Sequence, residues 1–255
     1  MANKFYAPGE ERAAKVNDLF ATVATRYDLM NDLQSFGLHR WWKRKLVQLA
    51  AVRPGEQALD VCCGTGDLSF ALAREGARVV GLDFNRPMLA VAETRQQRER
   101  EVREQRNVSR TATEIPAPQF VCGDAQQIPF PADSFEIVTS GYGLRNLANW
   151  ETGVSEMSRV AKPGGRLLVL EFGKPDNALW RRIYFGYLRI FSPLLGLIFC
   201  RSAAAYSYIL ESLKHYPAQR GVDAGMRAMG LENVRIINFM GGIMSVNYAE
   251  KPRPK

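Results

Sequence analysis

The fold is decided by the stretch LDVCCGTGDLSF at residues 59–70. Asp60 ends a run typical of a buried strand, and Gly64 and Gly66 occupy the turn that follows it. Glycine lets the backbone turn tightly and approach a ligand, because it has no Cβ. The next helix is expected to begin near Asp67, so that its free N–H groups face the same crevice. The stretch therefore predicts a nucleotide-type site at the carboxyl end of a parallel strand.

Two later strand ends carry acids that fit such a site. Asp83 closes the next apolar run, where a carboxylate can accept hydrogen bonds from two ribose hydroxyls. Asp124, followed by Ala125, closes a third run, where an adenine amino group could be read. The alternative is an ordinary strand–turn–helix unit in which these acids occur by chance.

The charge of the turn separates two classes of nucleotide ligand. A dinucleotide fold would have glycine at position 69, where this chain has Ser69. Asp60 and Asp67 bracket the glycine turn with negative charge, which suits a cationic ligand better than a pyrophosphate. These acids favour the sulfonium nucleoside S-adenosylmethionine as the cofactor.

Apolar runs alternate with helical patterns through the middle of the chain. Short continuous runs separated by helices predict an α/β fold with a mostly parallel sheet covered on both faces. Two strands around Gly241-Gly242 are expected to form a terminal β-hairpin that adds antiparallel edge strands. The expected parallel strands are 58–64, 77–83, 119–124, 135–140 and 165–172, and the hairpin strands are 234–240 and 243–250.

The bulk composition is that of one large domain. The chain has 255 residues, 46% of them hydrophobic, which is ample for a single core. A net charge of +8 suggests an anionic partner, although basic proteins are common. Four cysteines and two histidines show no zinc-type spacing, so we expect no metal and reduced cytoplasmic thiols. The N-terminus has no secretory h-region.

Two segments depart from the alternation. Residues 95–110 are almost wholly polar and are expected to form a solvated helix extension or a mobile loop. Residues 183–200 are strongly apolar, but Arg189 and Pro193 interrupt them, so we do not expect a membrane span. Residues 174–220 contain seven Lys or Arg and two acids. This suits an interfacial helix on an anionic leaflet; the alternative is a buried lid helix or a homodimer contact.

Beyond these features, the chain resembles the quinone-biosynthesis C-methyltransferases, the family that methylates demethylmenaquinone and ubiquinone rings. The resemblance covers nearly the whole chain, including regions outside the general methyltransferase core. It rests on the motifs FATVATRYDLMND (20–32), GLHRWWK (37–43), LDVCCGTGD (59–67), GDAQQIPFPADSFEIVT (123–139), YGLRN (142–146), RVAKPGGRLLVLEFGKP (159–175), SYILESLKHYP (207–217) and GGIMSVNYAEK (241–251).

The resemblance implies a Rossmann-like class I methyltransferase with a seven-stranded sheet and helices on both faces. It implies methyl transfer from S-adenosylmethionine to a ring carbon of a polyprenylated quinol, with demethylmenaquinol as the leading acceptor (EC 2.1.1.163 type). We divide the single domain, 1–255, into a helical N-terminal lid (1–50), a cofactor-binding core (51–173), an apolar and basic substrate lid (174–220) and a last helix with terminal strands (221–255).

The resemblance also assigns cofactor contacts and marks two departures. Gly141 is a candidate cofactor contact; relatives often have a serine at this position, and the neighbouring Ser140 could substitute for its hydroxyl. The polar insertion at 95–118 is longer than in relatives and lies away from the cofactor motifs. The contacts themselves map onto Thr65, Asp83, Asp124 and Ala125.

The stretch TSGYGLRNL (139–147) places Arg145 and Asn146 after the fourth expected strand, beside the cofactor. Methylating an aromatic carbon needs an electron-rich ring, so the reduced quinol should be the acceptor. Arg145 can stabilise the phenolate that forms when the quinol loses a proton, and it can hold a water that takes the proton. Asn146 can orient that oxygen or water. The alternative for Arg145 is a structural pair with a carboxylate.

Two residues before the first core strand complete the candidate site. Tyr27 belongs to a plausible lid, where an aromatic face beside a sulfonium would give cation–π attraction; helix packing is the alternative. His39 can relay the phenolic proton, because the pKa of histidine lies near neutrality. A hydrogen-bonded packing histidine is the alternative.

Other functions remain to be compared with quinol methylation. The same fold could methylate another phenolic ring, such as a tocopherol precursor, or serve as a non-catalytic cofactor-binding subunit of a quinone-synthesis complex. Intact Asp83 and Asp124 argue against the latter. Nucleic acid is not expected as a partner, because residues 140–146 read SGYGLRN and not an Asn/Asp-Pro-Pro-Tyr-type motif. We expect a cytoplasmic protein, with peripheral contact at the inner membrane face as one option.

Overall fold

The strand β1 (Gln57–Val61) lies between β2 (Arg78–Asp83) and β4 (Phe135–Gly141) in a seven-stranded sheet of order β3-β2-β1-β4-β5-β7-β6. This computed structural model describes residues 11–105, 116–200 and 203–254. Strands β1 to β5 run parallel, and β7 is antiparallel to both of its neighbours. The other strands are β3 (Gln119–Cys122), β5 (Ala161–Phe172), β6 (Glu232–Phe239) and β7 (Met244–Glu250).

Alternation of side chains across the central strand gives the sheet two apolar faces. Leu59 and Val61 belong to one buried cluster, whereas Ala58 belongs to a second. The first cluster includes residues of α6 (Trp150–Val160) and α9 (Ala218–Ala228), and the second includes residues of α3 (Leu38–Ala50) and α4 (Asp67–Arg74). The expected class I methyltransferase architecture is therefore confirmed.

The predicted strands agree with the observed ones, with small differences at their ends. The strand expected at 165–172 begins earlier, because β5 starts directly after α6 at Ala161. Its pairing with β4 shifts register between Phe135 and Ile137. The hairpin expected around Gly241 is present: a 3-10 turn, η3 (Met240–Gly242), joins β6 to β7, and Gly241 has a φ of +70°.

The described part of the polar segment 95–110 and the apolar segment 183–200, which interrupt the alternation of strands and helices, belong to different helices. Helix α5 (Arg86–Gln105) continues into the polar segment, which confirms a helix extension as far as residue 105; residues 106–115 lie outside the described part of the chain. The apolar segment forms α7 (Ala178–Cys200), which continues through Pro193. No helix in the described ranges is long and apolar enough to cross a membrane.

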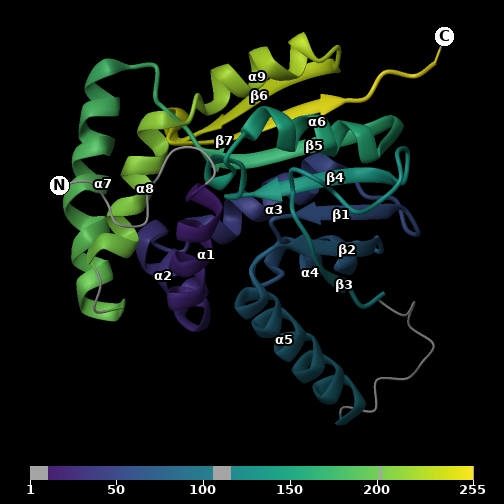
Figure 1. Ribbon diagram of the computed structural model, residues 1–255, viewed down its shortest axis with the longest axis horizontal. Coiled ribbons are helices and arrows are strands. Elements are labelled where there is room, and N and C mark those ends of the chain that lie inside the picture. Colours follow the sequence, from purple (N-terminus) through teal and green to yellow (C-terminus); the bar gives the residue numbers. More distant parts are fainter. Residues whose placement is uncertain (1–10, 106–115, 201–202, 255) are drawn as a thin grey trace.

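Helices from both ends of the chain meet beyond the carboxyl ends of the parallel strands (Figure 1). These are α1 (Glu11–Val23), η1 (Ala24–Arg26) and α2 (Tyr27–Ser35) with α7 and α8 (Ala203–His215). Gln34 joins α2 to α7, since its Nε2 donates to Ser192 Oγ at 2.9 Å and its carbonyl accepts from the Tyr187 hydroxyl at 2.7 Å. The strand ends and these helices therefore enclose the region in which the predicted site residues lie.

Candidate active site

The turn between β1 and α4 requires glycine. Gly64 and Gly66 both have positive φ values, of +55° and +81°. A Cβ on Gly66 would lie 2.9 Å from the Phe120 ring, closer than van der Waals contact allows. The turn can therefore form only with a small residue there, as the sequence motif predicts.

Asp83, at the end of β2, holds this turn in place. Its Oδ2 accepts a hydrogen bond from the backbone N–H of Gly64 at 2.8 Å, and its Oδ1 accepts one from Asn85 at 2.8 Å. Burial raises the pKa of Asp83, although these backbone donors oppose the shift. Asp83 and Gly64 border a small cavity of about 50 Å³, together with Met88. The carboxylate thus lies where the sequence placed it, beside the glycine turn.

Asp60 is buried on the other side of the turn. Its carboxylate accepts hydrogen bonds from Ser69 Oγ at 2.7 Å and Thr139 Oγ1 at 3.0 Å, and burial raises its pKa to about 6. Asp60 and Thr65 border a second small cavity of about 30 Å³. Ser69, the position that departs from the dinucleotide pattern, therefore has a local role in holding Asp60.

The negative charge expected at Asp67 is offset by two cations that sequence reasoning missed. Lys43 Nζ lies 2.7 Å from Asp67 Oδ2, and Arg95 contacts Oδ1. Burial alone would raise the pKa of Asp67, but these two cations outweigh it and hold the pKa below its usual range. The signal for Lys43 was present in the motif GLHRWWK, although its distance in sequence from the glycine turn gave no reason to pair them.

Asp124 and Ala125 do not border either small cavity. Asp124 is exposed, and its Oδ1 accepts a hydrogen bond from the backbone N–H of Gln126 at 2.8 Å; Ala125 is buried in the core. The strand that precedes them is nevertheless adjacent, since the N–H of Gly123 donates to the carbonyl of Asp83 at 3.0 Å. Both residues thus follow the strand end next to Asp83, and an adenine contact for them remains a prediction.

The N-terminal helices cover the glycine turn, as a lid would. Thr65 Oγ1 donates to Asp28 Oδ1 at 2.9 Å and so ties the start of α2 to the turn. Burial raises the pKa of Asp28. Tyr27 is half-buried beside it and borders both small cavities.

A much larger cavity, of about 310 Å³, lies beneath α7. It is mostly apolar and aromatic, and Tyr27 and Tyr142 are the residues that border it and both small cavities at once. Tyr142 has a φ of +62°, unusual for a bulky residue, and among the described residues its buried hydroxyl has no hydrogen-bond partner. These two tyrosines therefore lie between the large cavity and the glycine turn. Other lining residues include Phe20, Trp42, Phe172, Trp180, Tyr184, Tyr187, Tyr208 and Met244.

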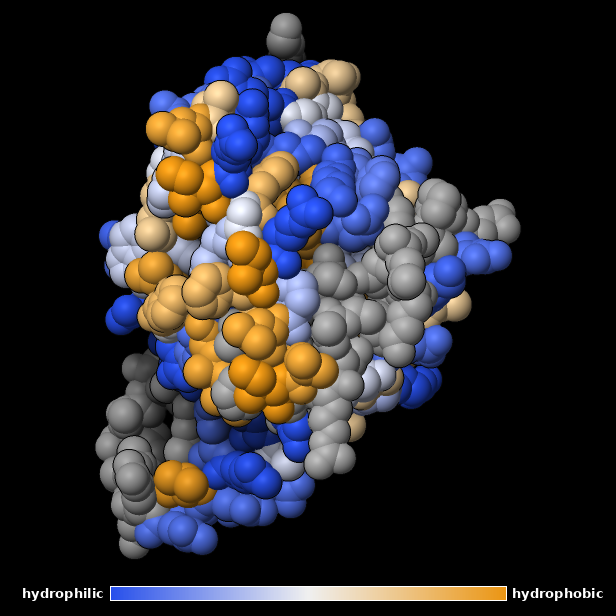
Figure 2. Space-filling view, turned by 90° about the vertical axis from the view of Figure 1, so that its left-hand side faces the viewer, coloured by the Kyte–Doolittle hydropathy of each residue, from blue (hydrophilic) through white to orange (hydrophobic). Residues whose placement is uncertain are grey.

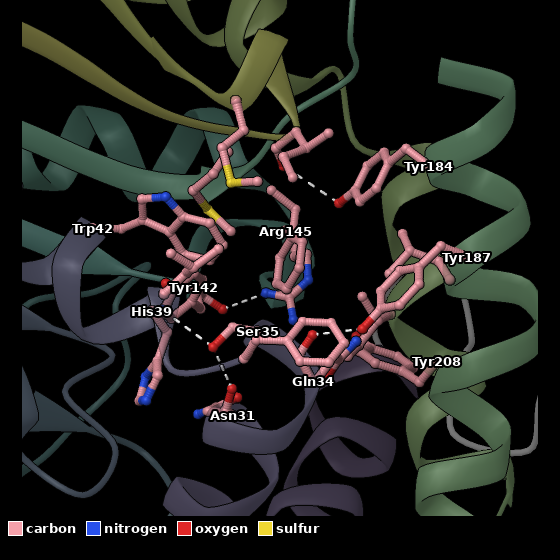
Figure 3. A pocket seen from close by; sticks show the side chains of 18 of the residues that line it. Asn31, Gln34, Ser35, His39, Trp42, Tyr142, Arg145, Tyr184, Tyr187 and Tyr208 are labelled. Carbon is pink, nitrogen blue, oxygen red and sulfur yellow. Dashed lines mark hydrogen bonds between the residues drawn. The ribbon is translucent and has the colours of Figure 1, made fainter. Parts of the chain in front are cut away.

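Arg145 borders the large cavity from the short turn η2 (Leu144–Asn146), between Tyr142 and the tyrosines of α7 in Figure 3. Its Nη1 lies 3.0 Å from Glu171 Oε1, and its guanidinium lies 4.8 Å from the Phe172 ring centroid. Burial lowers the pKa of Arg145, but the adjacent Glu171 carboxylate reverses the shift, so that the pKa is raised. The arginine therefore stays cationic in an apolar wall.

Glu171 was not predicted as a site residue. It is the one acid in the apolar run RLLVLEF, and an acid in a run expected to be buried is the signal that could have marked it. Glu171 is therefore the carboxylate partner that the alternative interpretation of Arg145, a structural ion pair, required. The pair fixes Arg145 at the cavity wall, and among the described atoms Nε of Arg145 has no hydrogen-bond partner.

Asn146 faces a different cavity from its neighbour. It borders the 50 Å³ cavity beside Asp83, and its Nδ2 donates to the Tyr142 carbonyl at 2.9 Å. Arg145 Nη1 donates to the same carbonyl at 2.6 Å. Within the described part of the chain, the buried Oδ1 of Asn146 has no partner. The Arg145-Asn146 pair thus spans the boundary between the two cavities.

His39 borders the large cavity, and its imidazole is hydrogen-bonded to Asp32. Its Nε2 lies 2.8 Å from Asp32 Oδ1, and burial lowers its pKa. In Figure 3 its imidazole points away from Arg145. Its Nδ1 is buried and has no partner in the ranges that the structure describes. This is the geometry of a neutral, hydrogen-bonded histidine.

Gly141 has a steric reason to differ from serine. A Cβ at this position would lie 2.7 Å from Leu68 Cδ1, so a side chain would require Leu68 to move. Its backbone borders both small cavities. The neighbouring Ser140 is buried, and its hydroxyl has no partner among the described residues.

Comparison with known proteins finds one matching family profile and relatives that align over most of the chain. The sequence profile described as the ubiE/COQ5 methyltransferase family matches residues 9–251. The ubiquinone/menaquinone biosynthesis C-methyltransferase UbiE of Azotobacter vinelandii is 40% identical over 248 residues, which cover 96% of this chain and 93% of the relative. UbiE of Ectopseudomonas mendocina is 41% identical over 248 residues, covering 96% of this chain and 92% of the relative.

Solved structures share the fold at low sequence identity. A SAM-dependent methyltransferase from Aquifex aeolicus superposes with a TM-score of 0.59 at 15% identity, covering 88% of this chain and 97% of its own. The [4+2]-cyclase SpnF superposes equally well, with a TM-score of 0.59 at 16% identity, covering 97% of this chain and 98% of its own. Because one fold appears with both names, the fold alone does not fix the reaction.

Proposed function

Since the chain belongs to the ubiE/COQ5 methyltransferase family, we propose that its acceptor is a reduced polyprenylated quinol, with demethylmenaquinol as the leading candidate. The family makes it an S-adenosylmethionine-dependent C-methyltransferase of ubiquinone/menaquinone biosynthesis. The observation that carries the proposal is the 310 Å³ aromatic cavity, with one buried cation in its wall, next to the glycine turn. A flat ring with a long apolar tail fits such a lining.

The residues around the glycine turn fit S-adenosylmethionine. Asp83 offers a buried carboxylate to the ribose, and Asn146 offers to the same cavity a buried Oδ1 that has no partner among the described residues. Lys43 and Asp67 border the second small cavity with a cation and an anion, which suits the amino and carboxylate groups of a methionine moiety. When bound, this cofactor supplies an electrophilic methyl group. Tyr27 and Tyr142 would then lie between that methyl group and the acceptor cavity.

Arg145 is the residue that we assign to phenolate stabilisation. The quinol must lose a phenolic proton as its ring carbon becomes nucleophilic, and the negative charge that develops needs a fixed cation in a dry site. Arg145 is held by Glu171 and borders the cavity, so it needs no rearrangement to meet that charge. It is a poor direct base, because the Glu171 pair raises its pKa further. We infer that a water at Arg145 takes the proton.

Asn146 and His39 are assigned smaller parts. Asn146 shares the Tyr142 carbonyl with Arg145 and so orients the turn that presents both side chains. His39 Nε2 is bonded to Asp32, and its ring points away from Arg145, so we expect it to shape the cavity more than to relay a proton. A packing role for His39 is therefore preferred over the relay.

Methyl transfer to defined acceptors tests the proposal. Purified protein is supplied with demethylmenaquinol, with a demethoxy-ubiquinol-type acceptor and with a tocopherol-type phenol, each in reduced and oxidised form. We expect methylation of the reduced demethylmenaquinol and little of its quinone, since a quinone ring is electrophilic. Equal rates on the oxidised form would contradict the phenolate mechanism. Preference for the phenol would favour the second candidate function, a ring methyltransferase on another phenolic acceptor.

A further inference from the structure

Helix α7 carries an apolar stripe on its outer face. Five residues that recur at helical spacing are exposed by about half or more of their surface, which places them on one side of the helix. We call them the outer stripe: Leu179 (69%), Ile183 (53%), Ile190 (65%), Leu194 (48%) and Leu197 (57%).

The outer stripe is not what attaches α7 to the rest of the protein. The opposite side of the helix is buried and carries the attachments: Tyr184 and Leu188 belong to the core cluster, and Ser192 accepts from Gln34. A helix on the surface of a globular protein normally turns a polar face to water. Here both sides are apolar, so in the described part of the chain the outer stripe is left without a partner.

The charges that helix α7 itself carries are all positive. Arg182 and Arg189 are exposed and lie seven residues apart, and therefore on the same side of the helix. Helix α7 contains no Asp or Glu. The outer stripe and the two arginines beside it are complementary to an anionic lipid leaflet. The acyl region of the leaflet would contact the apolar stripe, and the anionic headgroups would contact the arginines. A second copy docked stripe against stripe would bring its own arginines toward these.

The outer stripe also reaches the mouth of the large cavity. Ile183 belongs to both the stripe and the cavity wall, and Trp180 lies beside it. Phe36 is 78% exposed and Met240 is 47% exposed, and both line the same cavity. Figure 2, which looks onto this side of the molecule, shows hydrophobic side chains gathered over it with hydrophilic ones around them. Some of the exposed apolar residues on this face thus also form part of the cavity wall.

We propose that this face docks on an anionic lipid leaflet, with the outer stripe in the acyl boundary and Arg182 and Arg189 at the headgroups. A prenylated acceptor then passes from the leaflet into the 310 Å³ cavity without crossing water. The transfer of acceptor rests on the proposed function, whereas the docking itself does not. Tryptophan at the rim, as Trp180 is here, suits the boundary between acyl chains and headgroups.

Vesicle flotation tests the docking with matched variants. The full chain is floated with phosphatidylglycerol vesicles and with phosphatidylcholine vesicles at low salt. We expect binding to the former, a loss of tenfold or more in Ile190→Asp/Leu194→Asp, and about thirtyfold in Arg182→Gln/Arg189→Gln. Val102→Asp and Arg78→Gln/Arg98→Gln, which change exposed residues elsewhere, should bind as the wild type does. Failure of the wild type to float, or equal losses in the controls, would overturn the proposal.

Activity separates this proposal from the proposed function. The stripe variants should methylate a short-prenyl, water-soluble quinol at the wild-type rate and lose activity toward a long-prenyl quinol held in vesicles. A wild type that floats but methylates neither quinol would refute the proposed acceptor and leave the docking intact. Variants that become monomers while the wild type is a dimer, with flotation unchanged, would assign the stripe to a second copy and refute lipid docking.

Discussion

Arg145 Nη1 and Glu171 Oε1 lie 3.0 Å apart, and both side chains are almost wholly removed from water. Glu171 also accepts from the backbone N–H of Arg145 at 3.3 Å, so one carboxylate holds both the charge and the chain of the turn. A buried pair of this kind fixes geometry more than it adds stability, because both charges lose their hydration. The relationship therefore bears first on the position of the Arg145 guanidinium at the wall of the large cavity.

Glu171→Gln should destabilise the protein by about 3 kcal/mol, because it leaves the Arg145 charge buried without its counter-ion. Turnover should fall as well, since the guanidinium is no longer held at the cavity wall. Urea denaturation and initial rates measure the two effects. Glu99→Gln, which removes a partly exposed partner of Arg74, is the control and should cost less than about 1 kcal/mol. Similar losses of stability in both variants would show that the buried Arg145–Glu171 pair matters no more than an exposed ion pair.

Arg145→Ala should lower turnover by about 100-fold or more, since it removes the cation that we propose for stabilising the developing phenolate. Affinity for S-adenosylmethionine should change little, because Arg145 borders the large cavity and neither of the small ones. Single-turnover rates and calorimetry with S-adenosylmethionine check the two halves. Normal turnover in this variant would refute the assignment.

The titration of Asp60 should make the protein less stable as pH rises from about 4 to about 6. Burial raises its folded-state pKa to about 6, so in this window the folded state keeps a proton that the unfolded state, with a pKa near 3.9, has released. Asp60→Asn cannot titrate. The unfolding free energy of the wild type relative to this variant should therefore fall by about 2 kcal/mol between pH 4 and pH 7, and a flat difference would contradict the shifted pKa.

Thr65→Val should loosen the lid without disturbing the core. The substitution removes the hydrogen bond to Asp28 at nearly constant volume, and it leaves a half-buried carboxylate without that donor. Hydrogen–deuterium exchange should become faster in residues 27–35 and stay unchanged in β4. Thr94→Val, whose hydroxyl bonds only within its own helix turn at Ala90, provides the comparison and should leave the lid as it is.

Local patterns predicted the sheet well because strand formation follows from short apolar runs. The same holds for Asp83, whose place at a strand end is fixed by topology. Asp124 shows the limit: a strand end places a residue near a site, but its side chain turned to solvent and to Gln126. The actual cavity borders could be known only once the loops were folded.

Partnerships between distant segments were beyond sequence patterns. Glu171 is 26 residues from Arg145, and Lys43 is 24 residues from Asp67, so neither pair has a local spacing that would reveal it. The large cavity combines α1, α2, α3, η2, β5, α7, α8 and the β6–β7 turn, and no single motif contains it. The apolar character of 183–200 was evident, but its division into a buried and an exposed side depends on what packs against it.

Helix α2 is fastened at both ends: Asp28 is bonded to the glycine turn, and Gln34 is bonded to α7. A displacement of α7 that widens the large cavity must break two hydrogen bonds or carry α2 with it. If α2 moves, it pulls on the turn that would bind the methyl donor. Binding of the acceptor and binding of the methyl donor would therefore both depend on the position of α2. We expect this helix to set the order in which the two substrates bind and the products leave.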